Sequence, residues 1–507
     1  MILSTGCAKT AQVRLPTVLS DHMVLQRGMD VPVWGWTDPG AQVTVQMGTH
    51  KQVATATPEG KFLVHLPPME AGGPHTLTVT SANTVWVKDI LVGDVWICSG
   101  QSNMQWSVRQ ADQAEQEIAE AKYPRLRLFA VTRTPATEPQ DNCEGTWAPC
   151  SPETVPNFSA VAYFFGRDLH KHLDVPIGLV NTSWGGTPSE AWTSPDTAKK
   201  VAAFAPIVQR WQQQIASYAD QQKKWEETKD DLLAKWKDAV AKAKAAGKQA
   251  PRKPQPPGDP TLSPHRPSVL YNGMIAPLIP LRIAGAIWYQ GESNASRAYQ
   301  YRTIFPAMIQ DWRAHWGQGN FPFLFVQLAN FMKPKDEPAD SAWAELREAQ
   351  SMTLRLPKTG QAVIIDIGEA GNIHPKNKQD VGKRLALAAL AIAHGEKITY
   401  SGPTYKAMKV EDGKVRLTFD HVGDGLVAKG GGPLKGFAIA GADKKFVWAD
   451  AAIDGQTVIV SSDKVKEPVA VRYDWADNPD GTLYNKADLP ASPFRTDDWP
   501  GVTVDAK

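Results

Sequence analysis

The pattern of hydrophobic and polar positions divides the chain into three parts. Up to about residue 90, apolar side chains alternate with polar ones, as at Val43, Val45 and Met47. The same period of two returns after about residue 400, for example at Val415 and Leu417. Such alternation is typical of half-buried strands. We therefore expect an N-terminal β-sandwich over 1–90. Residues 401–507 are expected to form a C-terminal β-sandwich, or strands that complete the N-terminal one.

The middle of the chain alternates between short apolar runs and helical patterns. Nearly continuous apolar runs are typical of strands buried on both faces; they occur at 90–98, 176–181, 283–289, 321–328 and 362–367. Helical periodicity lies between them, at 160–173, 299–316, 341–356 and 379–394. Alternating strands and helices predict an α/β domain over 91–400, with three layers built around a parallel sheet.

One segment, at about 195–262, interrupts this alternation. Apolar residues recur there at a mixed spacing of three and four, a narrow stripe typical of long amphipathic helices. Among them are Trp211, Ile215, Tyr218 and Trp225. A proline-rich run over 251–260 ends the pattern. We therefore expect a helical insertion of one or two long helices within the α/β domain.

Composition excludes several classes of function. The 507 residues carry a net charge of only +2, which gives no electrostatic case for binding nucleic acid or an acidic membrane surface. No apolar stretch of about 18 residues predicts a membrane-spanning helix. No metal-ligand or phosphate-binding motif stands out, so we expect neither a metal ion nor another cofactor. Cys143 and Cys150 are close enough in sequence to form a disulfide, but spacing alone does not decide.

The first seven residues, Met-Ile-Leu-Ser-Thr-Gly-Cys, end in a Gly-Cys step. They lack the charged region and the long apolar run of a complete signal peptide. The step is compatible with the remnant of a lipoprotein cleavage site. We therefore expect a secreted, periplasmic or lipid-anchored protein whose signal is truncated.

The candidate chemistry begins at Ser102. This residue lies in the segment Ser-Gly-Gln-Ser-Asn-Met, which directly follows the apolar run 90–98. Ligand sites of open α/β sheets lie at the carboxyl ends of strands. A serine hydroxyl is a weak nucleophile that needs a base. Most Gly-x-Ser tripeptides are ordinary turns, so this segment alone is weak evidence.

Three further segments strengthen the assignment. The first, at 181–188, follows another apolar run, and its glycines allow backbone N–H groups to approach a ligand closely. The second, at 288–294, places polar and small residues at the end of a predicted strand. The third contains His374, just before a predicted helix. Histidine is the side chain best suited to accept and return a proton near pH 7.

Together these segments resemble the SGNH hydrolases, and specifically the sialate O-acetylesterase-like carbohydrate esterases. The resemblance extends to 19–26, 271–278, 378–386 and 483–497, and only the helical stretch near 195–260 lies outside it. It implies a three-layer SGNH-type domain that hydrolyses O-acetyl esters on sugars through an acetyl-serine. The sugar stays open between sialic acid and plant polysaccharides such as xylan, xyloglucan and pectin.

The resemblance also implies roles for individual residues. Ser102 matches the nucleophile and His374 the general base. The oxyanion hole would be formed by the backbone N–H groups of Ser102 and Gly185, with the side chain of Gln290. Residues expected at the substrate are Asn103, Trp184, Glu292 and Asn294, and Trp192 is expected near the site.

Many serine esterases add a carboxylate to the serine and the histidine to form a catalytic triad, and here the identity of that carboxylate is left open. Many SGNH enzymes carry an Asp three residues before the His, and that position is Gly371 here. A carboxylate there would hold the imidazole in its tautomer. The alternatives are a triad completed by Asp366 or Glu369, or a dyad of Ser102 and His374.

A rival hypothesis is a non-catalytic carbohydrate-binding protein that retained the esterase fold. The 18 Trp residues and the flanking β-sandwiches suit both hypotheses. The presence of both a nucleophile and a base favours the enzyme. The sequence does not reveal the oligomeric state.

Overall fold

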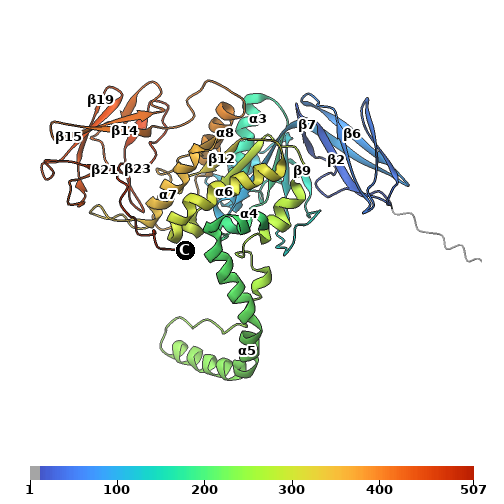
Figure 1. The fold of residues 1–507 in the computed structure, drawn as a ribbon, viewed down its shortest axis with the longest axis horizontal. Helices are drawn as coiled ribbons and strands as arrows, with labels where there is room; N and C mark the ends of the chain where they lie inside the picture. Colours follow the sequence, from blue (N-terminus) through green and yellow to red (C-terminus); the bar gives the residue numbers. More distant parts are fainter. Residues whose placement is uncertain (1–11) are drawn as a thin grey trace, which may run out of the picture.

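The structure is a computed structural model that describes residues 12–507. The first seven residues, on which the predicted secreted, periplasmic or lipid-anchored location rests, therefore lie outside the described residues. Figure 1 shows a central α/β body with one β region on each side and a helical arm that projects away from it. No helix within residues 12–507 combines the length and the apolar character needed to cross a bilayer.

The N-terminal β region is joined to the central body by one continuous strand. Its own strands are β1 (Val24–Gln26), β2 (Val31–Trp36), β3 (Gln42–Met47), β4 (His50–Thr55), β5 (Lys61–Leu66) and β6 (Gly72–Thr80). In β3, buried and exposed positions alternate as predicted. Strand β7 (Thr84–Gly100) pairs with β6 and β1 along its first part, and then enters the central sheet.

The central sheet has the order β13-β12-β11-β7-β10-β8-β9. The other strands of this sheet are β8 (Tyr123–Ala130), β9 (Trp147–Cys150), β10 (Ile177–Asn181), β11 (Gly285–Tyr289), β12 (Phe323–Val326) and β13 (Thr359–Ala362). All neighbouring pairs are parallel except β8 with β9. The carboxyl ends of β7, β10 and β11 therefore meet at one edge of the sheet.

Two helix layers cover this sheet. Helices α3 (Ala160–Leu173) and α8 (Lys378–Ile392) contact each other and share one hydrophobic cluster. Helices α6 (Ala298–Trp316) and α7 (Ala342–Met352) belong to a second cluster, which continues into the N-terminal β region. The predicted three-layer α/β class is confirmed. The short helices are α1 (Ser102–Gln105), α2 (Ala114–Ala119) and α4 (Pro195–Lys200).

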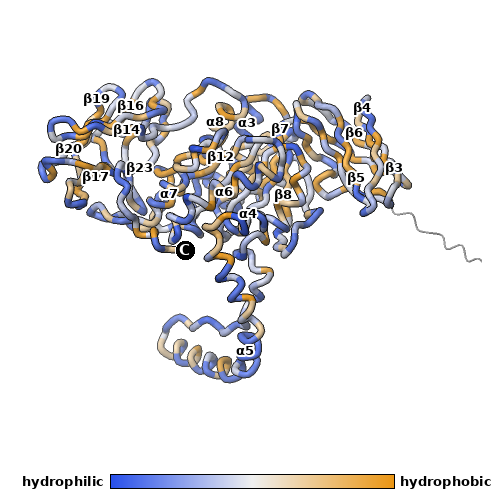
Figure 2. The backbone as a smooth tube through the Cα atoms, viewed as in Figure 1, coloured by the Kyte–Doolittle hydropathy of each residue, from blue (hydrophilic) through white to orange (hydrophobic). Residues whose placement is uncertain are grey.

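The insertion forms one long helix, α5 (Ala205–Ala245), of which only Ile207 is buried. It projects from the body, and the chain returns alongside it (Figure 1). The Trp236 indole N–H donates to Pro251 O at 2.9 Å, which attaches the proline-rich segment to the helix. Figure 2 shows polar and apolar positions mixed along this arm, as its narrow apolar stripe predicts.

The C-terminal strands form sheets of their own. One sheet contains β14 (Thr404–Glu411), β15 (Lys414–Asp420), β20 (Thr457–Ser461) and β19 (Asp450–Asp454). The other contains β18 (Val447–Trp448), β17 (Phe437–Ala440), β21 (Ala470–Tyr473) and β23 (Phe494–Arg495). Strands β16 (Leu426–Ala428) and β22 (Leu483–Asn485) form a further pair. This region and the N-terminal one lie at opposite ends of the body (Figure 1).

The three cysteines within residues 12–507 do not form a disulfide. Cys98, Cys143 and Cys150 are buried free thiols. Cys143 and Cys150 pack into different hydrophobic clusters and are not bonded to each other.

Candidate active site

Ser102 lies at the tip of a sharp turn between β7 and α1. Gly100 adopts φ +138°, and a Cβ there would lie 2.1 Å from Tyr289 O, so the turn requires glycine. Gln101 fixes the turn, because its Oε1 accepts hydrogen bonds from the backbone N–H groups of Gly291 and Ser293 at 3.4 and 3.2 Å. Ser102 itself is partly exposed.

The loop after β10 brings Gly185 against the nucleophile turn. A Cβ on Gly185 would lie 3.2 Å from Ser102 Cβ, and the neighbouring Trp184 N–H donates to Gly100 O at 3.0 Å. The Gly185 N–H donates to Gln105 Oε1 at 2.6 Å. Gly185 therefore presents a backbone donor beside Ser102, and in this structure the Gln105 amide accepts from it.

His374 is held beside the same turn. Its ring is stacked on Trp106, with 4.9 Å between centroids and 16° between planes. The side chain of Asn372 bonds to both the N–H and the C=O of His374, at 3.0 and 2.8 Å. The preceding carbonyl, Ile373 O, accepts from Asn103 Nδ2 at 3.0 Å. The residue after the nucleophile therefore bonds directly to the loop that carries the candidate base.

Neither candidate carboxylate bonds to the imidazole. Asp366 forms a bidentate ion pair with Arg384, at 2.6 and 2.7 Å. Glu369 accepts from Asn372 Nδ2 at 3.2 Å and from the Lys376 N–H at 2.8 Å. Glu369 thus orders the backbone of the His374 loop. The structure places Gly185 against Ser102 and bonds the His374 loop to Asn103, the residue after Ser102, while the two carboxylates bond to other partners.

Gln290 and Asn294 are fully buried behind the site. Gln290 Nε2 donates to Asn294 Oδ1 at 2.6 Å and to Thr187 O at 3.3 Å, and its Oε1 accepts from the Tyr301 hydroxyl at 2.8 Å. Asn294 in turn donates to Glu190 at 2.9 Å. With both amide hydrogens of Gln290 used, these residues support the loop that carries Gly185.

The two tryptophans expected near the site differ in environment. Trp184 is partly exposed beside Gly185. Trp192 is fully buried; its indole N–H donates to Thr187 Oγ1 at 3.0 Å, and its ring packs edge-on against Trp288. Trp192 is therefore part of the core.

Asn103 is the centre of a buried polar network that the sequence did not reveal. Its Nδ2 donates to Glu292 Oε1, and its Oδ1 accepts from Lys378 Nζ, both at 2.6 Å. Lys378 is fully buried, with its ammonium 5.2 Å from the centre of the Tyr289 ring. Asn103 and Glu292, both expected at the substrate, are therefore held by this network.

The network sets the protonation of the site. Burial lowers the pKa of Lys378 to about 7 and raises the pKa of Glu292. Burial also lowers the pKa of His374, and the positive charge of Lys378 lowers it further. A lowered pKa keeps the imidazole neutral near pH 7, which is the form that accepts a proton.

A partly exposed serine, a neighbouring histidine loop and a backbone donor are the groups that acyl transfer uses. Set at the carboxyl edge of this three-layer sheet, the arrangement has the form expected of an SGNH-type hydrolase.

Comparisons with known proteins identify the family. The family described as "carbohydrate esterase, sialic acid-specific acetylesterase" matches residues 92–223 and 265–391. Mouse sialate O-acetylesterase is 33% identical over 95% of this chain and 94% of its own length. The human sialate O-acetylesterase is 31% identical over 96% and 94%. The crystal structure of a carbohydrate acetylesterase from Xanthomonas citri aligns with a TM-score of 0.81 at 42% identity, covering 96% of this chain and all of that one.

The chain therefore belongs to the sialic acid-specific acetylesterase family of carbohydrate esterases. The resemblance drawn from the sequence motifs is confirmed, as is the assignment to the carboxylic ester hydrolases.

Proposed function

We propose that this protein removes O-acetyl groups from carbohydrate, with Ser102 as nucleophile and His374 as general base. The observation that carries the proposal is the contact between the two catalytic segments. Asn103 bonds to the His374 loop through Ile373 O, while Gly185 faces Ser102 from the other side. The activities after which the relatives are named, sialate O-acetylesterase and carbohydrate acetylesterase, support the same chemistry.

The proposed reaction has two acyl-transfer steps. Ser102 Oγ attacks the acetyl carbonyl carbon while His374 takes the hydroxyl proton. The tetrahedral intermediate collapses with cleavage of the bond to the sugar oxygen, which receives the proton from His374. Water, deprotonated by His374, then attacks the acetyl-serine, and acetate leaves as Ser102 recovers its proton.

The oxyanion of each intermediate would accept hydrogen bonds from the N–H groups of Ser102 and Gly185. The oxyanion would replace Gln105 Oε1 as the acceptor of the hydrogen bond from the Gly185 N–H. Each such donor stabilises the transition state by about 3 kcal/mol. Gln290 contributes by holding the loop that carries Gly185.

We further propose that the site works as a dyad. Stacking on Trp106 and the two bonds from Asn372 to the His374 backbone hold the base without a carboxylate on its ring. The partly exposed Trp106 and Trp184 would line the sugar. Acetylated sialic acid and acetylated plant polysaccharides are the substrates to compare.

Acetate release from a panel of acetylated saccharides, together with a chromogenic acetate, tests the activity. We expect Ser102→Ala and His374→Ala each to lower kcat by at least about 1,000-fold, because members of such a unit act together. Ser217→Ala on the exposed face of α5 and His172→Ala are matched controls that keep full activity. A wild-type protein inactive on every acetate would instead favour the non-catalytic carbohydrate-binding protein.

The dyad has its own test. Glu369→Gln keeps the side-chain shape and should leave kcat within about tenfold of wild type. A triad carboxylate replaced by its amide loses about 10,000-fold. Asp366→Asn should act mainly on stability, since it leaves the buried Arg384 guanidinium with a weaker partner. A 10,000-fold loss in either variant at unchanged Tm would overturn the dyad.

A further inference from the structure

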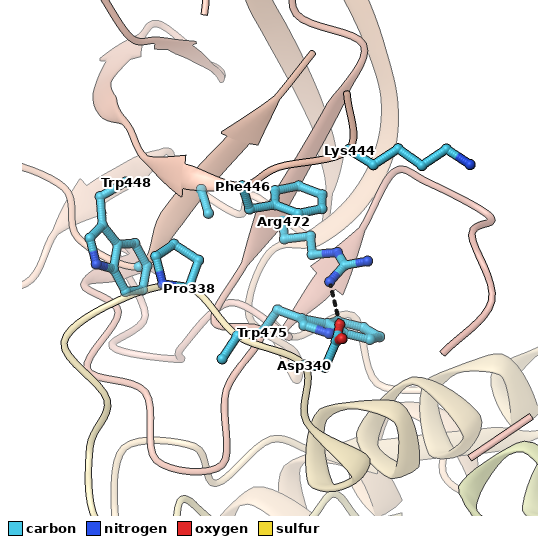
Figure 3. A pocket seen from close by; sticks show the side chains of 10 residues that line it. Pro338, Asp340, Lys444, Phe446, Trp448, Arg472 and Trp475 are labelled. Carbon is cyan, nitrogen blue, oxygen red and sulfur yellow. Dashed lines mark ion pairs between the residues drawn. The ribbon is translucent and has the colours of Figure 1, made fainter. Parts of the chain in front are cut away.

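A second cleft lies between the α/β body and the C-terminal β region. It has a volume of about 190 Å³ and opens between residues 338–340 and the strands β17, β18 and β21. Figure 3 shows Arg472 between Phe446 and Trp475 with Asp340 beside it, Trp448 next to Pro338, and Lys444 extending away from them. The principal side chains of the cleft are those of Asp340, Lys444, Phe446, Trp448, Arg472 and Trp475.

The aromatic rings of this C-terminal cleft are held in fixed positions. Trp448 is 43% exposed, and its indole N–H donates to Asp336 O at 2.7 Å. The Arg472 guanidinium lies between two rings, 4.2 Å from the centre of Phe446 and 5.1 Å from that of Trp475. An exposed indole held in this way offers a large apolar surface at little cost in conformational entropy.

Charges of both signs lie in and beside the cleft. Arg472 pairs with Asp497 at 2.9 Å and with the exposed Asp340 at 3.5 Å. Asp497 also pairs with Arg495 at 3.2 Å, and Lys444 lies at the rim. Because the carboxylates compensate much of the positive charge, the cleft is not a dedicated anion site. The charged side chains offer adjacent hydrogen-bond donors and acceptors, which match the vicinal hydroxyls of a neutral sugar.

The cleft is linked to the edge of the sheet that carries the active site. The segment 331–341 leaves the carboxyl end of β12, in the same parallel sheet as β7. Asn330, at its start, accepts from the Gly368 N–H at 2.6 Å and donates to Asn478 of the C-terminal region at 2.8 Å. Gly368 lies six residues before His374. Asn330 therefore bonds both to the chain that leads to His374 and to the C-terminal region that carries the cleft.

We propose that the C-terminal cleft is a second, non-catalytic saccharide-binding site that holds a neutral stretch of the polysaccharide deacetylated at Ser102. This rests on the proposed function. The exposed Trp448 surface packs against the apolar face of a sugar ring, and Asp340 and Arg472 bond to its hydroxyls. The cleft thereby increases affinity for polymers and leaves the chemistry at Ser102 unchanged.

The first test measures binding without turnover. Ser102→Ala protein is titrated calorimetrically with soluble xylan and xyloglucan. We expect Trp448→Ala in this background to weaken binding by about tenfold, because the substitution removes the exposed indole surface on which the sugar ring would pack. The matched control is Trp86→Ala, an indole 60% exposed on the N-terminal region, which should bind as before. Absence of binding to both polymers, or equal losses in both variants, would overturn the proposal.

The second test uses the active enzyme. Trp448→Ala should raise KM for the acetylated polymer about tenfold and leave kcat, Tm and the hydrolysis of a chromogenic acetate unchanged. A proportional loss on both substrates would mean a structural role and overturn the proposal. If the wild type releases no acetate while polymer binding still depends on Trp448, the proposed function fails and the saccharide site stands.

Discussion

Lys378 occupies a position where a lysine is doubly unfavourable. It is the first residue of α8, and the positive end of the helix dipole repels a cation there. It is also fully buried, where a charge requires compensation. Asn103 Oδ1, the Tyr289 ring and the nearby Glu292 provide that compensation. Its charge acts on His374, so the network that holds the nucleophile turn also adjusts the base.

Replacing Lys378 with glutamine tests this coupling. Lys378→Gln keeps a hydrogen-bond donor toward Asn103 and removes the charge. The pKa of Lys378, about 7, lies above the lowered pKa of His374, so Lys378 is mostly charged while His374 gains its proton. Its loss therefore raises the pKa of His374, and the acid limb of kcat/KM moves to higher pH. Above pH 7, where wild-type Lys378 loses its charge, the two profiles converge.

The control for that experiment is Lys376→Gln, an exposed lysine two residues away whose profile should match wild type. A Lys378→Gln profile with an unmoved or lowered acid limb contradicts the coupling. A uniform loss of rate at all pH values assigns Lys378 a purely structural role.

Some site residues could be predicted from the sequence because short motifs carry them. Ser102 and His374 stand in local patterns that need no knowledge of the fold. The network at Asn103 joins positions 189 and 275 residues apart, and no local pattern records such contacts. Gln290 and Asn294 show the opposite limit. Gln290 was expected in the oxyanion hole and Asn294 at the substrate, but the side chains of both bond to other parts of the protein.

Two glycines position the turns around the nucleophile, and they do so differently. At Gly100 an added Cβ would meet the backbone oxygen of Tyr289 at 2.1 Å, with φ at +138°. At Gly185 it would meet the flexible end of Gln105 at 3.1 Å and Ser102 Cβ at 3.2 Å. The first glycine is required for strand packing, and the second leaves space beside the nucleophile.

Alanine at each position should separate these roles. Gly100→Ala should destabilise the fold by roughly 2–4 kcal/mol, because the added Cβ would collide with the backbone of Tyr289 and neither strand can move aside. Activity should fall together with stability. Gly185→Ala should cost less than about 1 kcal/mol in stability but lower kcat by about 10–100-fold, since it crowds Ser102. Thermal unfolding and acetate release measure both quantities.

The control is Gly371→Ala, an exposed glycine in the His374 loop whose added Cβ meets nothing within 4 Å, and which should change neither quantity. Unchanged kcat in Gly185→Ala would show that this loop does not crowd the nucleophile.

Most central elements could be predicted because their periodicity is strong. The helix predicted at 160–173 is α3, with the same bounds. Strands β8 and β9 were missed, because β8 mixes exposed and buried positions without a regular period. Of the apolar run 362–367, only Ala362 remains in β13. Beyond it the chain leaves the ladder while staying largely buried, and Val363 O accepts from Arg384 instead.

At the scale of the whole molecule, the outer part of the helical arm contributes no buried residue to the body. The family match breaks off at residue 223 and resumes at 265, so it omits the outer part of α5 and the returning chain. None of residues 223–256 is buried. The base of the insertion differs, because a Cβ on Gly186 would lie 3.8 Å from His265 Nε2, next to the site. The arm and its base should therefore respond differently to mutation.

Excising 223–256 tests this division. Gln222 Nε2 donates to Pro257 O at 3.0 Å, so a short Gly-Ser linker can join these positions without moving either. Because no buried side chain is lost, we expect Tm to stay within a few degrees and kcat on a chromogenic acetate within about twofold. His265 and Gly186 remain in place, which is why the chemistry should persist. If the excised protein loses small-ester activity at unchanged Tm, the outer arm supports the active site, and the division between arm and body is wrong.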